Sequence, residues 1–174
     1  FDLGVSTFHY HQSGRGFSFT KNEPLDMRLD HRGESAEQIV NEYSETELAD
    51  LFFSLADEHR SRQIAKAIVQ YRKKECIKTS LQLANLIENS VRRTGRIHPA
   101  TKVFQALRIA VNRELENISD AIEQAVSVLK TGGKILIITF HSGEDRVVKN
   151  KFKEMAQLGL IEIVTKKVVK PTRR

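Results

Sequence analysis

The chain opens with FDLGVSTFHYH, which places an acid, a glycine and two histidines close together. Asp2 lies in an apolar run typical of the end of a buried strand, and Gly4 and Ser6 follow it. A carboxylate at this position can bind a ribose or the amine of a cofactor, or accept a hydrogen bond from an exocyclic amino group. A cap or a buried hydrogen bond fits the same residues, so both interpretations stay open at this point.

Three histidines and a cysteine are the other candidates for chemistry. His9 and His11 are alternate residues of a segment expected to be extended, which would point both to one side. A catalytic zinc normally has three protein ligands and no third ligand is apparent, so the sequence predicts no metal site. His141 follows the apolar run KILIITF, where either a function or a structural hydrogen bond fits. Cys76 suits packing better than nucleophilic chemistry.

A basic block occupies the middle of the chain. Residues 60–102 carry 11 Lys or Arg against 2 Asp or Glu, whereas the net charge of the whole chain is +6. Neutralisation of nucleic-acid phosphates needs such a density, and the alternative is a set of solvated helix faces. Three arginines near the end of the block are candidates for contact with phosphates, and we call them the arginine segment: Arg92, Arg93 and Arg96.

Composition excludes several classes of protein. A single cysteine rules out an internal disulfide framework and a multi-cysteine metal site, and a cytoplasmic location is expected. Hydrophobic residues make up 40% of the chain, and no stretch reaches the roughly 18–20 apolar residues that cross a bilayer. We therefore expect a soluble globular protein with no membrane partner. The sequence does not fix the oligomeric state, and a homodimer stays open.

The middle of the chain contains several sequence patterns that mark the starts of helices. Ser35 with Gln38, and Ser44 with Glu47, fit the capping box, in which two residues satisfy each other's backbone amides. Apolar residues recur at helical spacing after each box and again after Thr79. The sequence therefore predicts a helical insertion over residues 35–97. A long active-site loop that packs down on the protein is expected before it, within residues 1–34.

The remaining part, residues 98–174, is expected to alternate between helices and strands. His98-Pro99 starts a long helix that reaches Leu115, and Ser119 caps the next helix. KILIITF is the clearest strand, Ser142 caps the helix that follows it, and LIEIVTKKVV is a last strand. This order predicts an open α/β sheet with a helical insertion. Three strands do not complete such a sheet, so we expect further strands and a C-terminal segment to lie outside this sequence.

Five blocks of sequence occur in a fixed order: DLGVST, RGFSF, PLDMRLD, HPATKVFQALRIAVNRELE and GGKILIITFHSGEDRVVKNKF. Together they resemble the bacterial small-subunit (16S) rRNA cytosine-N4 methyltransferase family, motif by motif and over nearly the whole chain. The resemblance implies an α/β fold, a class I methyltransferase (Rossmann-like) sheet that is incomplete at the N-terminus, with an all-helical inserted domain that helps to receive RNA. It also implies S-adenosylmethionine as the cofactor.

The resemblance implies roles for individual residues. Asp2 matches the acid of the family's DLGVSS-type motif, a cofactor-binding position, and His9 stands at a second cofactor position where the family usually has glutamine. The usual FHSLEDR reads FHSGEDR here, with Gly143 in place of leucine. The family's glycine-rich loop and its following acid would precede Phe1, so we expect a fragment that holds part of the site.

The implied reaction is methyl transfer from S-adenosylmethionine to the exocyclic N4 amine of a cytidine in 16S rRNA of the small ribosomal subunit. Such a displacement requires alignment and exclusion of water, and no covalent intermediate. Asp2 and His141 are the catalytic candidates, as acceptors for the amine. Phe8, Phe17 or Phe19 would stack on the base, or else belong to the core. A non-catalytic RNA-binding fragment and a methyltransferase acting on DNA or protein stay open as alternatives.

Overall fold

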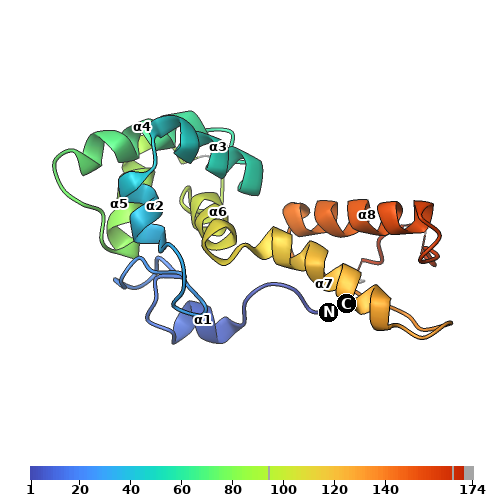
Figure 1. Cartoon of the computed structure of the whole chain (residues 1–174). Helices are drawn as coiled ribbons and strands as arrows, with labels where there is room; N and C mark the ends of the chain where they lie inside the picture. The colour runs from blue at the N-terminus through green and yellow to red at the C-terminus, as the bar shows by residue number, and fades with distance from the viewer. Residues whose placement is uncertain (94, 166, 171–174) are drawn as a thin grey trace. The chain divides into compact units, whose positions relative to one another are not determined.

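The computed structural model describes residues 1–93, 95–165 and 167–170. These residues divide between two compact units, of which unit 2 is Val5–Glu114 and unit 1 combines Phe1–Gly4 with the chain from Leu115 onward (Figure 1). Unit 2 includes parts of all three segments predicted from the sequence, 1–34, 35–97 and 98–174. The described residues form eight α-helices: α1 Thr7–His11, α2 Ala36–Glu42, α3 Glu45–Ala56, α4 Ser61–Arg72, α5 Ser80–Ser90, α6 Thr101–Asn112, α7 Glu114–Val128 and α8 Ser142–Gln157.

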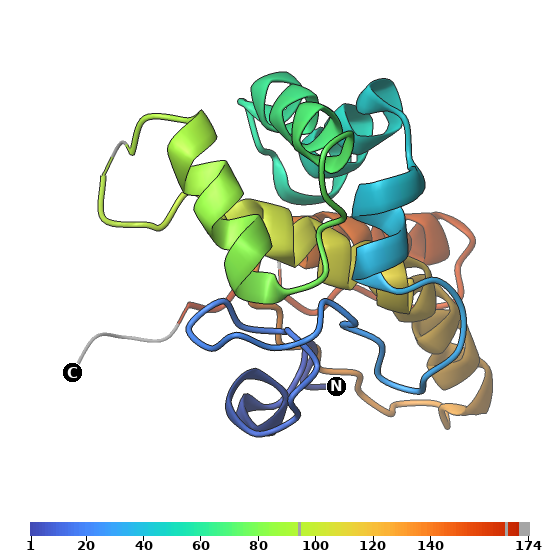
Figure 2. The same ribbon diagram turned by 90° about the vertical axis from the view of Figure 1, so that its left-hand side faces the viewer.

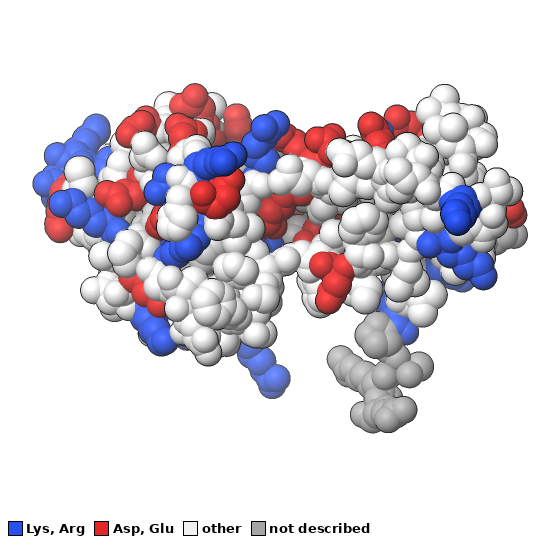
Figure 3. Space-filling view, turned by 60° about the horizontal axis from the view of Figure 1, so that its bottom comes forward, with Lys and Arg blue, Asp and Glu red and all other residues white. Residues whose placement is uncertain are grey.

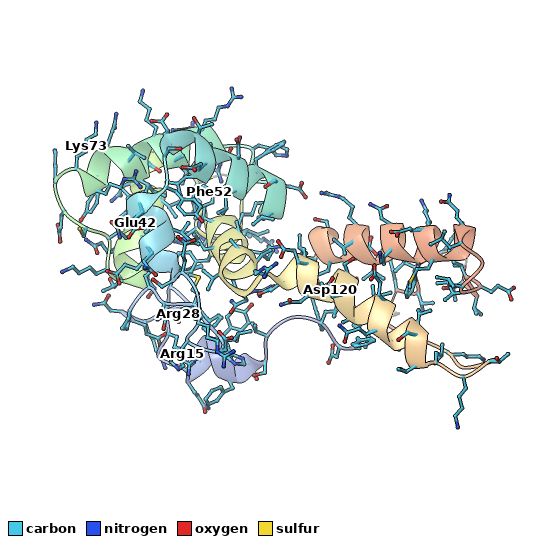
Figure 4. All side chains as sticks on the ribbon, viewed as in Figure 1. Arg15, Arg28, Glu42, Phe52, Lys73 and Asp120 are labelled. Atoms are coloured by element: carbon cyan, nitrogen blue, oxygen red, sulfur yellow. The ribbon has the colours of Figure 1, made fainter. Side chains whose placement is uncertain are left out.

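Unit 2 is built around α6. Helices α2 to α5 form an arch around it, and α6 packs directly against α2 and α3 (Figures 1 and 2). Phe52 on α3 points inward and is fully buried, whereas Lys73 points outward beyond the end of α4 (Figure 4). The largest side chains of unit 2 with no exposed surface come from α3 to α6 and from the loops: Leu25, Met27, Leu48, Phe52, Ile64, Ile68, Ile77, Leu83, Ile87 and Leu107.

The predicted helix starts of unit 2 are confirmed. The Ser35 hydroxyl accepts a hydrogen bond from the Gln38 backbone N–H at 3.3 Å, and the Gln38 side chain accepts one from the Ser35 N–H at 2.9 Å. Ser44 and Glu47 form the same reciprocal pair, and the Thr79 hydroxyl caps α5. These caps use groups within three residues of each other, which is why a local pattern is enough to predict them.

The loop before α2 packs down, as predicted. Phe17, Leu25 and Met27 all belong to the core cluster of unit 2. One part of this region differs from the prediction, because the segment around His9 and His11 is the short helix α1 rather than extended chain. Side chains two residues apart on a helix do not share a face, so the geometry assumed for the two histidines is wrong.

The break between α6 and α7 is also not where the sequence predicts it. Helix α6 ends at Asn112, and Arg113 adopts a left-handed conformation with φ +50°. Leu115 consequently belongs to α7, and Ser119 lies inside that helix instead of capping it. The break coincides with tertiary bonds of Asn112, whose side-chain amide donates to the carbonyl of Met27 at 2.8 Å and accepts from the Leu29 N–H at 2.9 Å.

Unit 1 consists of α7, α8 and two extended segments. Asp2 and Ile138 form a parallel β-bridge, in which the Leu3 N–H donates to the Ile138 carbonyl at 3.2 Å and the Ile138 N–H donates to the Phe1 carbonyl at 2.9 Å. A small core lies beneath it, with the buried side chains Ile118, Ile122, Val148 and Met155, against which Leu3 and Ile137 pack.

The predicted α/β fold class is wrong. The described residues contain helices and isolated bridges and no strand, so no Rossmann-like sheet is present in them. KILIITF pairs with one neighbour over a single bridge, and alternate side chains are exposed: Leu136 at 75%, Ile138 at 47% and Phe140 at 69%. The strands of a parallel sheet pair with their neighbours over several residues and are covered on both faces, whereas this segment has one bridge and one exposed face.

The last predicted strand is absent as well. Residues 160–165 and 167–169 of LIEIVTKKVV form no strand, and residue 166 lies outside the described residues. Most of this segment is exposed, and Ile161 is the residue of it that packs against the small core of unit 1. Among the described residues, no helix combines the length and the apolar character needed to cross a membrane.

Candidate functional site

The two extended segments of unit 1 run in the same direction and end at the same edge. Beyond the bridge, one continues into Gly4 and the other into Phe140 and His141. A Cβ atom added at Gly4 would lie 3.7 Å from Cδ2 of Phe140 and 3.9 Å from Oε1 of Glu144. The turn after Asp2 and the turn after Phe140 are therefore in contact. We call this group the turn edge: Asp2, Gly4, Phe140, His141 and Glu144.

The conformation of the turn edge depends on glycine. Gly4 has φ +85°, in the left-handed region that residues with a Cβ rarely adopt. The absence of a side chain also leaves the space between the Phe140 ring and the Glu144 carboxylate open. The DLG part of the first motif thus has a structural explanation, since the glycine turns the chain immediately beyond the bridge.

His141 begins α8 as its N-cap, whereas the sequence predicted that Ser142 would do so. The Nδ1 atom of His141 accepts a hydrogen bond from the Glu144 backbone N–H at 3.3 Å. The Glu144 carboxylate accepts in return from the backbone N–H groups of Phe140 at 2.7 Å and His141 at 3.3 Å. The Nε2 atom of His141 is buried 3.3 Å from Oε1 of Glu144, at an angle that makes no hydrogen bond.

Glu144 is an ionised group in the interior of the turn edge, and it is only 1% exposed. Burial acts to raise the pKa of this carboxyl, but the side chain of His141 and the backbone N–H of Phe140 outweigh burial and hold the pKa below its usual range. The positive end of the α8 dipole favours the same charge. Sequence reasoning assigned Glu144 to the helix dipole alone and missed its place in the site, although its spacing from His141 is that of a capping box.

Asp2 contributes an exposed carboxylate to the turn edge. Its backbone is fixed by the bridge to Ile138, and its residue surface is open to solvent. A carboxylate held in this way can accept hydrogen bonds from hydroxyl or amino groups of a ligand. Asp2 and His141, the two predicted catalytic residues, therefore lie at one edge of the same unit.

His9 belongs to unit 2, where α1 holds it. Its Nδ1 atom lies 3.1 Å from the Ser6 hydroxyl, and its ring contacts the ring of Phe17 with centroids 5.5 Å apart. Of the three predicted stacking aromatics, Phe17 is buried in the core and Phe19 packs edge-on against Phe104 at 5.0 Å. Phe8 alone among these three is exposed enough to meet a base.

The arginine segment follows α5 in a part of unit 2 without helix, and residue 94 within it lies outside the described residues. All three of its arginines are exposed. The Arg60 guanidinium donates to the Arg92 carbonyl at 2.9 Å, which ties this segment to the start of α4. On the face shown in Figure 3, Lys and Arg side chains lie among Asp and Glu side chains, most densely towards the outer left end. The exposed guanidinium groups of the arginine segment are accessible to solvent, as contact with phosphates requires.

Comparison with known proteins identifies the class to which this chain belongs, which is that of the methylases. A family model described as the MraW methylase family matches residues 1–174. The chain belongs to this family, and the resemblance found in its motifs is confirmed.

Three relatives carry the name Ribosomal RNA small subunit methyltransferase H. The protein of Leptospira interrogans is 47% identical over 177 residues, covering 99% of this chain and 53% of the relative. That of Persephonella marina is 48% identical over 175 residues, covering 98% and 59%. That of Treponema denticola is 52% identical over 160 residues, covering 90% and 51%. The chain thus spans a little over half the length of the curated relatives that it matches.

Proposed function

We propose that the protein containing this chain transfers a methyl group from S-adenosylmethionine to the exocyclic N4 amine of a cytidine in 16S rRNA of the small ribosomal subunit. Membership of the MraW methylase family over residues 1–174 supports the methyl transfer. The names of the relatives, which specify ribosomal RNA of the small subunit, support the substrate. The five motifs support the cytidine amine as the acceptor.

The turn edge is the observation that carries this proposal. Two turns distant in sequence meet there, one with the exposed carboxylate of Asp2 and the other with the buried Nε2 of His141. An exposed acceptor beside a turn without a side chain fits the hydroxyl and amino groups of S-adenosylmethionine. When bound, this molecule supplies an activated methyl group on a sulfonium centre.

The residues of the chain bind the cofactor and orient it towards the cytidine. In this proposal, Asp2 accepts hydrogen bonds from the cofactor or from the cytidine amine, and His9 supplies a second contact to the cofactor. The Nδ1 atom of His141 accepts a hydrogen bond as the cap of α8, so the ring carries its proton on Nε2 and cannot accept from the amine there; in this proposal Asp2 is the acceptor and His141 holds the turn that faces it. Phe8 stacks on the base and helps to exclude water.

The arginine segment supplies a grip on RNA that does not depend on base sequence, because guanidinium groups neutralise phosphates of any sequence. In this proposal the protein acts in the cytoplasm, with the small ribosomal subunit as its partner. A homodimer is compatible with this assignment and stays a prediction.

Methyl transfer by the full-length protein to small subunits that lack the modification is the decisive experiment. Label from S-adenosylmethionine should appear in 16S rRNA as N4-methylcytidine on nucleoside analysis. Asp2→Asn should weaken binding of S-adenosylmethionine by about tenfold or more, because a hydrogen bond to a charged group becomes one to a neutral amide. Asp120→Asn is the matched control, since Asp120 is an exposed acid on α7 (Figure 4).

Each alternative function has its own result in this assay. Label in DNA or protein with none in rRNA would identify a methyltransferase of another substrate class. RNA binding without transfer to any substrate would identify a non-catalytic RNA-binding protein. Equal affinity of the Asp2→Asn and Asp120→Asn variants for S-adenosylmethionine would remove Asp2 from the cofactor site.

A further inference from the structure

A buried charged residue interrupts the apolar face of α6. Arg108 is only 8% exposed, and its neighbours Leu107 and Ile109 are buried in the core. Burying a guanidinium costs free energy unless its N–H groups are paired. The partners of Arg108 therefore indicate which parts of the fold it holds together.

The first partner of Arg108 is Glu114. The Nε and Nη2 atoms of Arg108 donate to the two carboxylate oxygens of Glu114 at 2.8 Å and 2.9 Å, which is a bidentate pair. In an uninterrupted helix, residues six positions apart would point about 120° away from each other. The left-handed turn at Arg113 removes this obstacle and brings Glu114 back against Arg108.

The second partner is Tyr10 on α1, to whose hydroxyl the Nη1 atom of Arg108 donates a hydrogen bond. Burial acts to lower the pKa of Arg108, but the Glu114 carboxylate and the Tyr10 hydroxyl outweigh burial and raise the pKa, so the guanidinium keeps its charge. The Nε, Nη1 and Nη2 atoms of Arg108 therefore each donate a hydrogen bond to one of these two residues. We call Tyr10, Arg108 and Glu114 the Arg108 cluster.

Apart from Tyr10, helix α1 is held by the contact of the His9 ring with Phe17 and by bonds from residues close in sequence. It is five residues long, contains no buried residue and has no side-chain cap at its N-terminus. The Ser13 hydroxyl donates to the His9 carbonyl at 2.6 Å and Lys21 donates to the His11 carbonyl at 2.8 Å, but both bonds come from the loop that directly follows. Tyr10 is the residue through which α1 is bonded to α6, a helix of the core.

We propose that Arg108 and Glu114 are positioning residues for methyl transfer, which hold Tyr10 and so fix α1 with His9 in the orientation that binds the cofactor. This inference rests on the proposed function and deepens it, because it assigns a role to three residues outside the turn edge. His9 and Tyr10 are adjacent on a single helical turn. A rotation of α1 released by loss of the Tyr10 bond would consequently move the His9 ring away from its contacts with Ser6 and Phe17.

The test is Tyr10→Phe in the full-length enzyme, which removes one hydroxyl and keeps the ring. We expect the KM for S-adenosylmethionine to rise about tenfold, because a hydrogen bond to a charged group is lost. The kcat at saturating cofactor and the affinity for RNA should change by less than about twofold. Tyr43→Phe is the matched control, since its hydroxyl donates to Glu34 at 2.8 Å outside the Arg108 cluster, and it should change none of these values.

A second variant separates positioning from stability. Arg108→Lys keeps the charge but loses the planar fork, so it should raise the same KM, and Tyr10→Phe in that background should add little because the bond is already broken. A wild-type KM in Tyr10→Phe, or a fall in kcat and thermal midpoint with an unchanged KM, would overturn the inference. Absence of methyl transfer by the wild-type enzyme would instead refute the proposed function.

Discussion

Replacing Gly4 by alanine separates backbone strain from blockage of the turn edge. Gly4 has φ +85°, and an L-residue in the left-handed region costs roughly 1–2 kcal/mol. The added Cβ would meet Phe140 and Glu144 at 3.7 Å and 3.9 Å, which are ordinary van der Waals distances. We therefore expect Gly4→Ala to lower the free energy of unfolding by the strain alone, about 1–2 kcal/mol, and to fill the space where the two turns meet.

Gly132→Ala provides the matched control. Gly132 has φ +82°, and a Cβ added there would meet nothing within 4 Å. Its strain is nearly the same, so both variants should lose similar stability in urea unfolding of the full-length protein. Only Gly4→Ala should weaken binding of S-adenosylmethionine, which titration calorimetry measures directly. Equal cofactor affinity in the two variants would refute the assignment of the turn edge as a ligand site, and a larger stability loss in Gly4→Ala would show that the methyl group clashes.

Two further variants test the charges of the two units. Glu144→Gln should lower the free energy of unfolding by about 1–2 kcal/mol at pH 7, since it weakens charge-assisted hydrogen bonds. Because the folded pKa of Glu144 lies below the value of about 4.3 expected when unfolded, its contribution is complete above that pH and is lost as pH falls through the folded pKa. Urea unfolding at pH 7 and pH 3 should therefore show a difference that shrinks in acid, and an equal difference at both pH values would contradict the buried ionised state. Replacing all three arginines of the arginine segment by alanine should weaken RNA binding, lower the slope of log affinity against log salt by up to about 2–3, and leave cofactor affinity unchanged. Filter binding over a salt series measures this slope, and unchanged RNA affinity would identify these arginines as a solvated surface only.

Features that depend on near neighbours in sequence could be predicted. The capping boxes at Ser35 and Ser44 use groups three residues apart, and the apolar stripes that follow them need only helical spacing. The roles of Asp2 and His141 stay predictions; the sequence singles them out because an acid and an imidazole stand at the ends of apolar runs. The structure places both at the turn edge.

Features that depend on distant partners could not be predicted. KILIITF has the composition of a buried strand, but pairing and cover come from other segments, and the described residues supply one bridge. The break at Arg113 involves a left-handed residue other than glycine, for which the sequence carries no local signal. Tyr10 and Arg108 lie far apart in sequence, so the sequence alone does not predict their hydrogen bond.

The pairing of Asp2 with Ile138 also sets an order of events during synthesis. Residues 5–114 form a unit of their own, whereas the bridge needs residue 138, which leaves the ribosome roughly one to five seconds later at about 5–20 residues per second. Prior collapse of the intervening chain shortens the free loop that must close, and each halving of that loop saves about 0.6 kcal/mol of entropy. Folding of residues 5–114 therefore shortens the loop that must close before the two halves of the turn edge can pair. Mutations in residues 5–114 that slow this folding should delay assembly of the turn edge, although none of them lies in it.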